Sequence, residues 1–311
     1  MRRRAAAPTP TTSGTESPSA ARVRRFQGRV LDWGAAHRRD LPWRATRDPW
    51  RVLVSEVMLQ QTQVDRVVPH YERFVATFGT PADCARVRPA EVVRLWSGLG
   101  YNRRALNLHR AAGTVVAEHA GAVPREDGAL RALAGVGPYT ARAVRSLAFG
   151  EDVAAVDTNA VRVLTRCLSG SPLTATAATR LGDRLVPAGL SWEFNQTMFD
   201  LGASVCTGSR PDCAHCPLRH QCAWHRGGKT TPDPWRSGPT ARRQSAFAGS
   251  DRQGRGRLLH ALRAGDVKHA TLAAACGWPD DPARAERVAA ALVAEGFARW
   301  TQGADPVLRL L

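Results

Sequence analysis

The stretch Leu133-Ala-Gly-Val-Gly-Pro-Tyr-Thr-Ala141 determines the fold that we expect for this chain. Gly135 and Gly137 lack a Cβ atom and can take positive φ angles in a tight turn, so that their amide groups point outward. Pro138 suits the first position of a helix, and apolar residues follow it at helical spacing. The stretch therefore predicts a helix-hairpin-helix whose second helix can bind an anion, such as a DNA phosphate, at its N-terminus. A helix–helix turn with glycine caps would have the same sequence.

Asp157 stands twenty residues after Gly137, in the stretch AAVDTNAVRVL. An apolar run, residues 153–156, precedes it and a helical pattern follows, so we expect Asp157 to be the N-cap of a helix. A carboxylate in that position is held rigidly beside the positive end of the helix dipole and stays ionised. Asp157 can thus be a simple N-cap. The same carboxylate could also face a positive charge that develops during a reaction.

Four cysteines lie close together in CTGSRPDCAHCPLRHQC: Cys206, Cys213, Cys216 and Cys222, with the spacing C-x6-C-x2-C-x5-C. Iron–sulfur clusters are held by four cysteine thiolates, and this spacing differs from the separated C-x-x-C pairs of a zinc ribbon. We expect an iron–sulfur cluster, with a zinc site and two disulfides as alternatives. The odd total of seven cysteines argues for a reducing cytoplasm, and those outside the loop are expected to be buried: Cys84, Cys167 and Cys276.

The composition indicates a polyanionic partner. The chain has 311 residues, with 44 Lys and Arg against 27 Asp and Glu, and a formal net charge of +17. Such an excess favours nucleic acid through phosphate neutralisation and counterion release. The sequence has no apolar run of roughly 18 residues, so we expect no membrane span. Residues 1–22 are basic and rich in Pro, Ser and Thr, which predicts a disordered tail and no signal peptide.

Helical periodicity dominates residues 23–226. Asp48 is a good N-cap and Pro49 a good first residue, so a helix is expected to begin there and to carry Glu56. Another helix is expected over residues 90–99, ending at Gly100.

Residues 227–248 are rich in Gly, Pro and Ser and lack periodicity, which predicts a linker. Order returns in residues 249–311, where three helices and a two-stranded wing predict a winged-helix-like segment. These elements are expected near residues 258–262, 272–276, 288–293, 297–300 and 307–311.

The hairpin, Asp157 and the cysteine loop, in this order and spacing, resemble the helix-hairpin-helix DNA glycosylase superfamily of the endonuclease III type over about residues 26–225. The resemblance implies an all-α, two-lobed fold in which the loop 206–222 holds a 4Fe-4S cluster. It also implies a monomer that acts on double-stranded DNA.

A lysine distinguishes two branches of this superfamily. The endonuclease III branch, by resemblance, removes oxidised pyrimidines and nicks the strand through a Schiff base, which requires a primary amine two residues after the second hairpin glycine. Here that position is Tyr139, which we place among the candidate catalytic residues. The lysines of the chain, Lys229 and Lys268, lie elsewhere, so a lysine-driven lyase is not expected.

Three stretches resemble the adenine DNA glycosylase branch, which removes adenine mispaired with 8-oxoguanine. They are LPWR (41–44), SEVMLQQTQV (55–64) and GLGYNRRALNLHRAA (98–112), where Asn102 replaces a usual second tyrosine. The resemblance implies that Glu56 is the catalytic acid and that Gln61 and Tyr101 wedge into the duplex on the 8-oxoguanine side. The residues that it places at the adenine pocket are Trp43, Arg44, Leu59 and Asp200.

Simple physical chemistry supports Glu56 as the acid. Its apolar neighbours at helical spacing are expected to bury it partly, and desolvation raises a carboxyl pKa, which keeps a proton available for adenine N7. A solvated helix glutamate is the alternative. Once the adenine nucleotide is flipped out, ionised Asp157 would stabilise the oxocarbenium-like sugar, and Asn159 could orient Asp157 or a water.

The C-terminal 63 residues, 249–311, are too few for the Nudix-like domain that reads 8-oxoguanine in many adenine glycosylases. They resemble the short tail of some actinobacterial members, and their arginines (Arg252, Arg255, Arg257, Arg263) suit either phosphate contacts or a solvated face. The sequence thus predicts a monofunctional glycosylase for adenine opposite 8-oxoguanine or guanine, in the bacterial cytoplasm at the nucleoid. An oxidised-pyrimidine glycosylase and a non-catalytic damage-binding protein are the alternatives.

Overall fold

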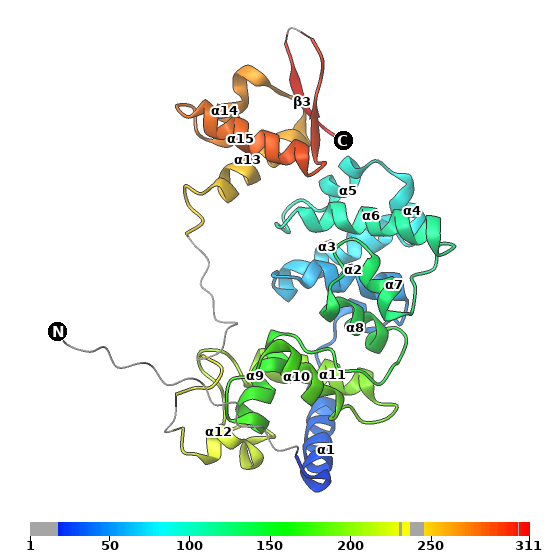
Figure 1. The fold of residues 1–311 in the computed structure, drawn as a ribbon, viewed down its shortest axis with the longest axis vertical. Coiled ribbons are helices and arrows are strands. Elements are labelled where there is room, and N and C mark those ends of the chain that lie inside the picture. The colour runs from blue at the N-terminus through cyan, green and yellow to red at the C-terminus, as the bar shows by residue number, and fades with distance from the viewer. Residues whose placement is uncertain (1–17, 230–231, 237–245, 304) are drawn as a thin grey trace, which may run out of the picture.

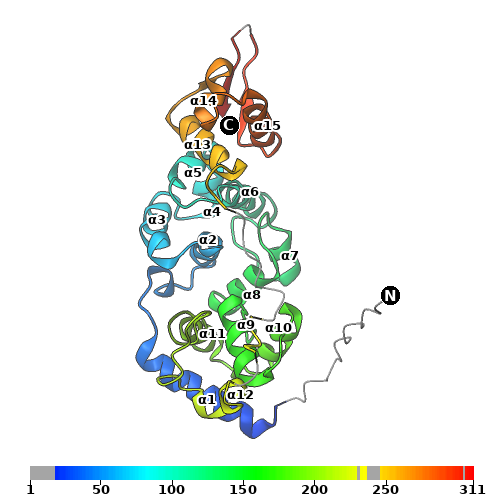
Figure 2. The same ribbon diagram turned by 90° about the vertical axis from the view of Figure 1, so that its left-hand side faces the viewer.

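The computed structural model describes residues 18–229, 232–236, 246–303 and 305–311. These residues form three parts that are stacked along the longest axis of the molecule (Figure 1). Residues 49–147 make up the middle part, which we call the first lobe. The second lobe, residues 20–37 with 158–226, lies at one end, and the C-terminal segment lies at the other (Figure 2).

The first lobe begins with α2 (Pro49–Leu59). The N-cap and the proline from which the sequence predicts its start both act as expected. Asp48 accepts a hydrogen bond from the amide of Arg51 at 2.8 Å, and Pro49 is the first helical residue. α2 packs against its neighbours along its whole length, so residues 52–58 are all buried. The other helices of this lobe are α3 (Val64–Thr77), α4 (Pro81–Arg86), α5 (Pro89–Leu95), α6 (Arg103–Glu118), α7 (Asp127–Ala132) and α8 (Pro138–Leu147).

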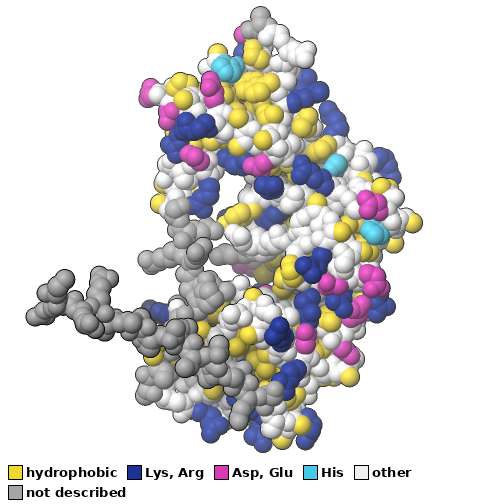
Figure 3. All heavy atoms as spheres, in the orientation of Figure 1, with side chains coloured by type: hydrophobic (Ala, Val, Ile, Leu, Met, Phe, Trp, Pro, Cys, Tyr) yellow, Lys and Arg dark blue, Asp and Glu magenta, His cyan; other side chains and the backbone are white. Residues whose placement is uncertain are grey.

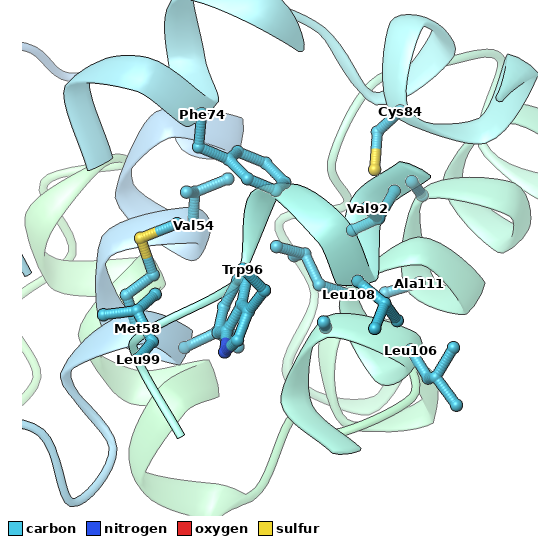
Figure 4. Close-up of a cluster of buried hydrophobic side chains, with 14 of the residues drawn as sticks. Val54, Met58, Phe74, Cys84, Val92, Trp96, Leu99, Leu106, Leu108 and Ala111 are labelled. Atoms are coloured by element: carbon cyan, nitrogen blue, oxygen red, sulfur yellow. The ribbon is translucent and has the colours of Figure 1, made fainter. Parts of the chain in front are cut away.

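The core of the first lobe is centred on Trp96, which follows the last turn of α5 (Figure 4). Its ring meets the Phe74 ring nearly edge-on, with centroids 6.0 Å apart. Its indole N–H also donates to the carbonyl of Gly100 at 3.3 Å, which ties the loop before α6 to the core. The helix expected over residues 90–99 therefore ends early, at Leu95, because the chain turns to fit Trp96 into the core.

The second lobe has its own buried cluster, which includes Phe26 and Val30 of α1 (Ala20–His37) and Phe194 and Met198 of α11 (Ser191–Asp200). The separate cores of the two lobes confirm the all-helical, two-lobed fold predicted for this part of the chain. Its remaining elements are α9 (Thr158–Leu164), η2 (Thr165–Ser169), α10 (Ala175–Asp183), η3 (Leu201–Val205), η4 (Arg219–Gln221) and α12 (Ala223–Arg226), and η1 (Pro42–Arg44) connects α1 to α2.

The C-terminal segment contains α13 (Asp251–Ala264), η5 (His269–Thr271), α14 (Leu272–Cys276) and α15 (Pro282–Ala294). β2 (Ala298–Trp300) and β3 (Val307–Leu310) pair antiparallel, as expected. A short strand missed by the sequence reading, β1 (Val267–Lys268), pairs with the other side of β3, so the sheet order is β1-β3-β2. A strand of two residues is too short to show alternating hydrophobicity.

This segment is joined to the first lobe by specific contacts. Arg263 of α13 donates to the carbonyl of Val93 at 3.1 Å and to the side chain of Asn102 at 2.5 Å. Within the segment itself, Arg255 forms a two-point ion pair with Glu295, at 2.8 and 2.9 Å. The expectation that these two arginines face phosphate or solvent is therefore wrong, because both guanidinium groups are engaged within the protein.

Two predicted boundaries also differ from the structure. α1 begins at Ala20, inside the predicted tail, because the Ser19 side chain caps the helix by accepting a hydrogen bond from the amide of Arg22. The first part of the predicted tail, residues 1–17, lies outside the described residues. Within the predicted linker, Asp233 pairs with buried Arg166 at 2.5 Å, so residues 232–236 belong to the second lobe. The rest of that linker is described only at residues 227–229 and 246–248.

Candidate active site

Glu56 lies in the middle of α2 and is 5% exposed. Burial among apolar neighbours raises its pKa to about 7, against the opposing influence of a hydrogen bond from Tyr139 and the nearby charge of Arg44. The negative charge of Asp157 raises the pKa further. The solvated-glutamate alternative is therefore wrong, and a substantial fraction of Glu56 carries a proton at neutral pH.

Tyr139 is the second residue of α8, which packs against α2. Its hydroxyl donates to the Glu56 carboxyl, and burial together with the charges of Glu56 and Asp157 raises the tyrosine pKa well above its ordinary value. Tyr139 thus stays protonated and acts as a hydrogen-bond donor to Glu56.

Asp157 is the N-cap of α9, as expected. One carboxylate oxygen accepts from the amide of Ala160 at 2.7 Å, and the other accepts from the side-chain amide of Asn159 at 2.9 Å. Asn159 is held in turn by Arg162, whose guanidinium donates to the Asn159 Oδ1 atom at 2.6 Å. Burial raises the pKa of Asp157 more than these hydrogen bonds lower it, and the resulting pKa is about 6. The carboxylate is therefore still mostly ionised at pH 7.

Glu56 belongs to the first lobe and Asp157 to the second, yet both lie close enough to Tyr139 to raise its pKa. The site therefore lies where the two lobes meet. Because burial raises both carboxyl pKa values but to different extents, a state with Glu56 protonated and Asp157 ionised is populated near neutral pH.

Arg44 and Asp200 form a buried ion pair beside this site. The Arg44 Nη1 and Asp200 Oδ2 atoms are 2.7 Å apart, and Arg39 donates to the same carboxylate through its backbone and its side chain. These arginines lower the pKa of Asp200 despite its burial, so both of its oxygens serve to position Arg44. The sequence reading missed Arg39 because its partner is 161 residues away.

The other residues expected at the adenine pocket differ in exposure. Trp43 is buried with its ring edge-on to Tyr71, at a centroid distance of 5.4 Å, so it forms part of the first-lobe core. Leu59 ends α2 and is only partly buried. Arg44 has one buried donor, the Nε atom, that finds no hydrogen-bond acceptor in the described part of the chain.

Gln61 and Tyr101 lie in adjacent loops and line the same pocket, so the structure brings the two predicted wedge residues together. Both have positive φ angles, 57° for Gln61 and 46° for Tyr101, which side chains other than glycine rarely adopt. Tyr101 is also 46% exposed, an unusual state for a large aromatic side chain. Strained and exposed residues of this kind are typical of functional sites.

Buried Arg104 of α6 holds both loops, and the sequence reading missed it. Its guanidinium donates to the carbonyls of Val57, Met58 and Gln60 at the end of α2, at 2.9, 2.7 and 2.6 Å. It also donates to the carbonyl of Gly100 at 3.1 Å. The available signal was its position on the apolar face of the helix, four residues before Leu108 and eight residues before Ala112.

The hairpin has the expected form with one difference. Gly135 has a φ of 81°, and a Cβ atom there would lie 2.8 Å from the Cβ atom of Asn107. Gly137, expected to be similar, has a φ of −91° and is the extended N-cap of α8. A Cβ atom on Gly137 would have no other heavy atom within 4 Å, so there is open space beside the N-terminus of α8.

The predicted metal-binding cysteines, Cys206, Cys213, Cys216 and Cys222, line a common pocket after η3. All seven cysteines are in the described residues and none forms a disulfide; the three outside the loop are buried, as predicted. Buried Arg166 donates to the Cys206 sulfur at 3.4 Å and adds positive charge beside the thiols. In the described part of the chain, no three His, Cys, Asp or Glu side chains are placed to hold a metal ion.

Among the helices that the structure describes, none has both the length and the apolarity that crossing a membrane requires.

The fold and this site define a helix-hairpin-helix DNA glycosylase of base-excision repair. The family model described as "HhH-GPD superfamily base excision DNA repair protein" matches residues 54–187, which include the hairpin and both candidate catalytic carboxyls. The chain is also 40% identical over 277 residues to the adenine DNA glycosylase of Mycolicibacterium smegmatis, which covers 88% of this chain and 92% of that protein. The chain belongs to the adenine DNA glycosylase family, as the sequence predicts.

Solved structures show the same fold. A thermostable thymine-DNA glycosylase superposes with a TM-score of 0.64 at 33% identity, covering 67% of this chain and 98% of its own. Endonuclease III in a non-covalent complex with DNA superposes with a TM-score of 0.58 at 25% identity, covering 69% and 100%. These superpositions leave about a third of this chain uncovered.

Proposed function

We propose that this protein hydrolyses the N-glycosidic bond of adenine mispaired with 8-oxoguanine or guanine in double-stranded DNA. The main observation behind the proposal is that Glu56 of the first lobe lies close enough to Asp157 of the second lobe for its pKa to be raised by the Asp157 charge. The pKa values of the two carboxyls are about 7 and about 6, respectively. Glycosidic cleavage needs one carboxyl that is protonated and one that is ionised, and these two groups provide that combination near pH 7.

In the proposed reaction, the adenine nucleotide is extruded from the duplex toward Glu56. Glu56 delivers its proton to adenine N7, which makes the base a better leaving group as the C–N bond breaks. Asp157 stabilises the positive charge that develops on the sugar, and Asn159 keeps its carboxylate oriented through the 2.9 Å hydrogen bond. A water then attacks the sugar and leaves an abasic site.

The reaction is proposed to be monofunctional. Tyr139 provides a hydroxyl where Schiff-base chemistry requires an amine. Of the lysines, Lys229 lies over the Trp224 ring, 5.6 Å from its centroid, and Lys268 is on β1 in the C-terminal segment. Neither lies in α2, α8 or α9, the helices at which Glu56, Tyr139 and Asp157 are found.

DNA is proposed to contact three features of the site. The amides of Gly137 and the first turn of α8 bind a backbone phosphate. Gln61 and Tyr101 enter the duplex in place of the extruded nucleotide. Arg44 contacts adenine through its unpaired Nε–H, beside Trp43 and Leu59, while Asp200 orients Arg44.

We also propose that Cys206, Cys213, Cys216 and Cys222 hold a 4Fe-4S cluster. Thiols that line a shared pocket suit a cluster in which each thiolate binds a different iron, and Arg166 supplies compensating charge. The cluster would organise the loop that carries Arg210 and Arg219 toward DNA phosphates.

The C-terminal residues, 249–311, are proposed to be a winged-helix-like module, supported by three helices beside a small sheet. The protein is proposed to act on DNA as a monomer. Its glycosylase core would extend from α1 to the cluster loop, with the anchored residues 232–236 added to it.

The test is an excision assay on duplexes that carry one adenine opposite 8-oxoguanine, guanine or thymine, with alkali to cleave abasic sites. The wild-type protein should release adenine from the first two duplexes only. Glu56→Gln and Asp157→Asn should each bind these duplexes and lose base release, whereas Glu295→Gln, in the C-terminal segment, should remain active.

Three other results would contradict parts of the proposal. Release of an oxidised pyrimidine without release of adenine would indicate the endonuclease III activity. Duplex binding without release of any base would indicate a non-catalytic damage binder. Efficient borohydride trapping of a protein–DNA adduct would show that an amine attacks the sugar.

A further inference from the structure

The chain segment that leads into Asp157, residues 153–156, is not helical and belongs to no sheet. Residues 154–156 make no backbone-to-backbone hydrogen bond within the part of the chain that the structure describes. Ala154 and Ala155 are each only 1% exposed. Buried backbone amides and carbonyls need partners, because an unmet one costs free energy. Side chains from other elements must therefore bind this segment.

Buried Asn195 of α11 binds the segment at two points. Its Oδ1 atom accepts a hydrogen bond from the amide of Ala155 at 2.9 Å, and its Nδ2 atom donates to the carbonyl of Val153 at 2.9 Å. The Nδ2 atom also donates to the hydroxyl of Ser146 on α8 at 2.8 Å. Asn195 and Ser146 are 2% and 0% exposed, so these hydrogen bonds are made away from water. Asn195 therefore joins the segment to both α8 and α11.

An ion pair binds the alanine between these two points. The Arg142 Nε atom of α8 donates to the carbonyl of Ala154 at 2.7 Å. The carboxylate of Asp183, the last residue of α10, accepts from the amide of Ala154 at 3.0 Å and pairs with Arg142. Gly182 lets α10 come this close, because a Cβ atom there would lie 2.8 Å from the Ala154 Cβ atom. The segment is thus held from three helices.

α8 is the helix that these contacts share with the proposed acid. Tyr139, Arg142 and Ser146 follow one another at three- and four-residue spacings, so they lie on one face of α8. Tyr139 donates to Glu56. Arg142 binds the segment that ends at Asp157, and Ser146 binds the asparagine that holds the same segment. α8 lies where the two lobes meet and packs against both α2 and α11 (Figure 1).

We propose that Asn195, Arg142 and Asp183 are positioning residues for Asp157, and that they set where its carboxylate lies relative to Glu56. The inference rests on the proposed function, because that function makes both carboxyls act on one nucleotide. A single residue separates the bound segment from Asp157, so the loss of a contact to the segment displaces the carboxylate. A misplacement of about 1 Å at a reacting group can lower a rate by about a hundredfold.

The experiment compares two arginines of α8 in the full-length protein. Arg142→Met keeps the apolar stem and removes the donor to the segment. Arg145→Met is the matched control, because the Arg145 side chain is 22% exposed and that of Arg142 is 19% exposed. Arg145 pairs with Asp127 and Glu151 and makes no printed contact with residues 153–156. Figure 3 shows such basic and acidic side chains mixed over α7 and α8, where the first lobe meets the second.

Three quantities are measured for each variant: the single-turnover rate of adenine release at saturating enzyme, the dissociation constant for the duplex and the midpoint of chemical unfolding. Arg142→Met should lower the release rate by about tenfold to a hundredfold and leave the dissociation constant unchanged. Arg142→Lys keeps the charge beside Asp183 and should recover part of the rate. Arg145→Met should lower the unfolding midpoint by a similar amount to Arg142→Met and keep the wild-type rate. Asn195→Ser should lower the rate in the same way as Arg142→Met.

The pH profile gives a readout that a loss of stability alone does not move. The ionisable groups that face Asp157 are Arg162 of α9, Tyr139 of α8 and Glu56 of α2, and none of them is altered by these substitutions. Burial raises the pKa of Asp157 to about 6, so a displaced carboxylate that water reaches should titrate at lower pH. The acidic limb of the release rate should therefore move to lower pH in Arg142→Met and stay in place in the control.

Equal release rates in Arg142→Met and the wild type, equal losses in Arg142→Met and Arg145→Met, or an acidic limb that does not move would each overturn the inference while the proposed function stands. The wild-type rate in Asn195→Ser would remove Asn195 from the positioning residues. If the wild-type protein releases no adenine in parallel assays, the proposed function itself fails. The two failures are therefore distinguishable in one set of preparations.

Discussion

The guanidinium of Arg104 donates to the carbonyl of Gln60 at 2.6 Å, across 44 residues of sequence. This contact joins the C-terminal end of α2, the helix of Glu56, to the first turn of α6. A cation at a helix C-terminus also interacts favourably with the helix dipole. Arg104 thus fixes the end of the helix that carries Glu56 and the loops that carry Gln61 and Tyr101 relative to one another. It contacts none of the reacting groups.

Arg104→Lys should reduce both stability and the efficiency of base extrusion. A lysine keeps the charge but not the planar fork, so several buried carbonyls lose their donor, at a cost of about 2 kcal/mol or more in the free energy of unfolding. The single-turnover rate of adenine release at saturating enzyme should fall more than the affinity for duplex. Rapid-quench assays and chemical denaturation measure these quantities.

The neighbouring Arg103, which is 66% exposed, offers the control. Arg103→Lys should change neither unfolding nor the release rate appreciably. If Arg104→Lys lowers stability but leaves the saturated release rate unchanged, Arg104 is a structural residue only.

Contacts within a single element could be predicted from the sequence, and contacts between distant elements could not. Asp157 was recognisable as an N-cap and Gly135 as a positive-φ residue because each conformation depends on its immediate neighbours. The partners of Arg104 and Asp200 depend on how helices pack, and no local pattern encodes that packing. Gly137 was misread for a related reason, since glycine permits a positive φ without requiring one.

The rate of adenine release should depend on pH as a bell-shaped curve. Glu56 must be protonated, so activity is lost as the pH rises through about 7, and Asp157 must be ionised, so activity is lost as the pH falls through about 6. The two groups interact, so the measured limbs belong to the pair. Single-turnover assays between pH 5 and about 9 measure the curve, and a flat profile would contradict the assigned roles.

Tyr139→Phe should move the alkaline limb of that curve to higher pH. The tyrosine hydroxyl donates to Glu56 and lowers its pKa, so removing the hydroxyl raises the pKa and extends the range in which Glu56 is protonated. Tyr71→Phe is the matched control, because Tyr71 packs against Trp43 and does not influence either carboxyl. An alkaline limb that stays in place in Tyr139→Phe would show that Glu56 is not the group that titrates there.

Cys216→Ser should remove iron and visible colour from the purified protein. Replacing one of four thiolate ligands weakens the proposed cluster, and the loop over residues 206–222 should become more susceptible to proteolysis. Cys276→Ser alters a buried cysteine of the C-terminal segment and should retain full iron content. Metal analysis and absorption spectra give the answer, and stoichiometric zinc in the wild-type protein would refute the cluster.

Gly135→Ala and Gly137→Ala should differ in their effect on stability. Gly135 has a positive φ, which costs alanine about 1–2 kcal/mol, and the new Cβ atom would also press on Asn107. Gly135→Ala should therefore lower the melting temperature. Gly137 is extended and faces open space, so Gly137→Ala should fold with a loss of no more than about 1 kcal/mol.

The methyl group that Gly137→Ala adds would occupy space through which a phosphate is proposed to approach the amides of α8. Gly137→Ala should thus weaken duplex binding by about tenfold, because hydrogen bonds to a charged group are worth roughly 1.5–3 kcal/mol. Fluorescence anisotropy with an undamaged duplex measures the loss without involving the catalytic residues. If Gly137→Ala binds as tightly as the wild type, the hairpin is a structural turn and another surface of the protein must hold the DNA backbone.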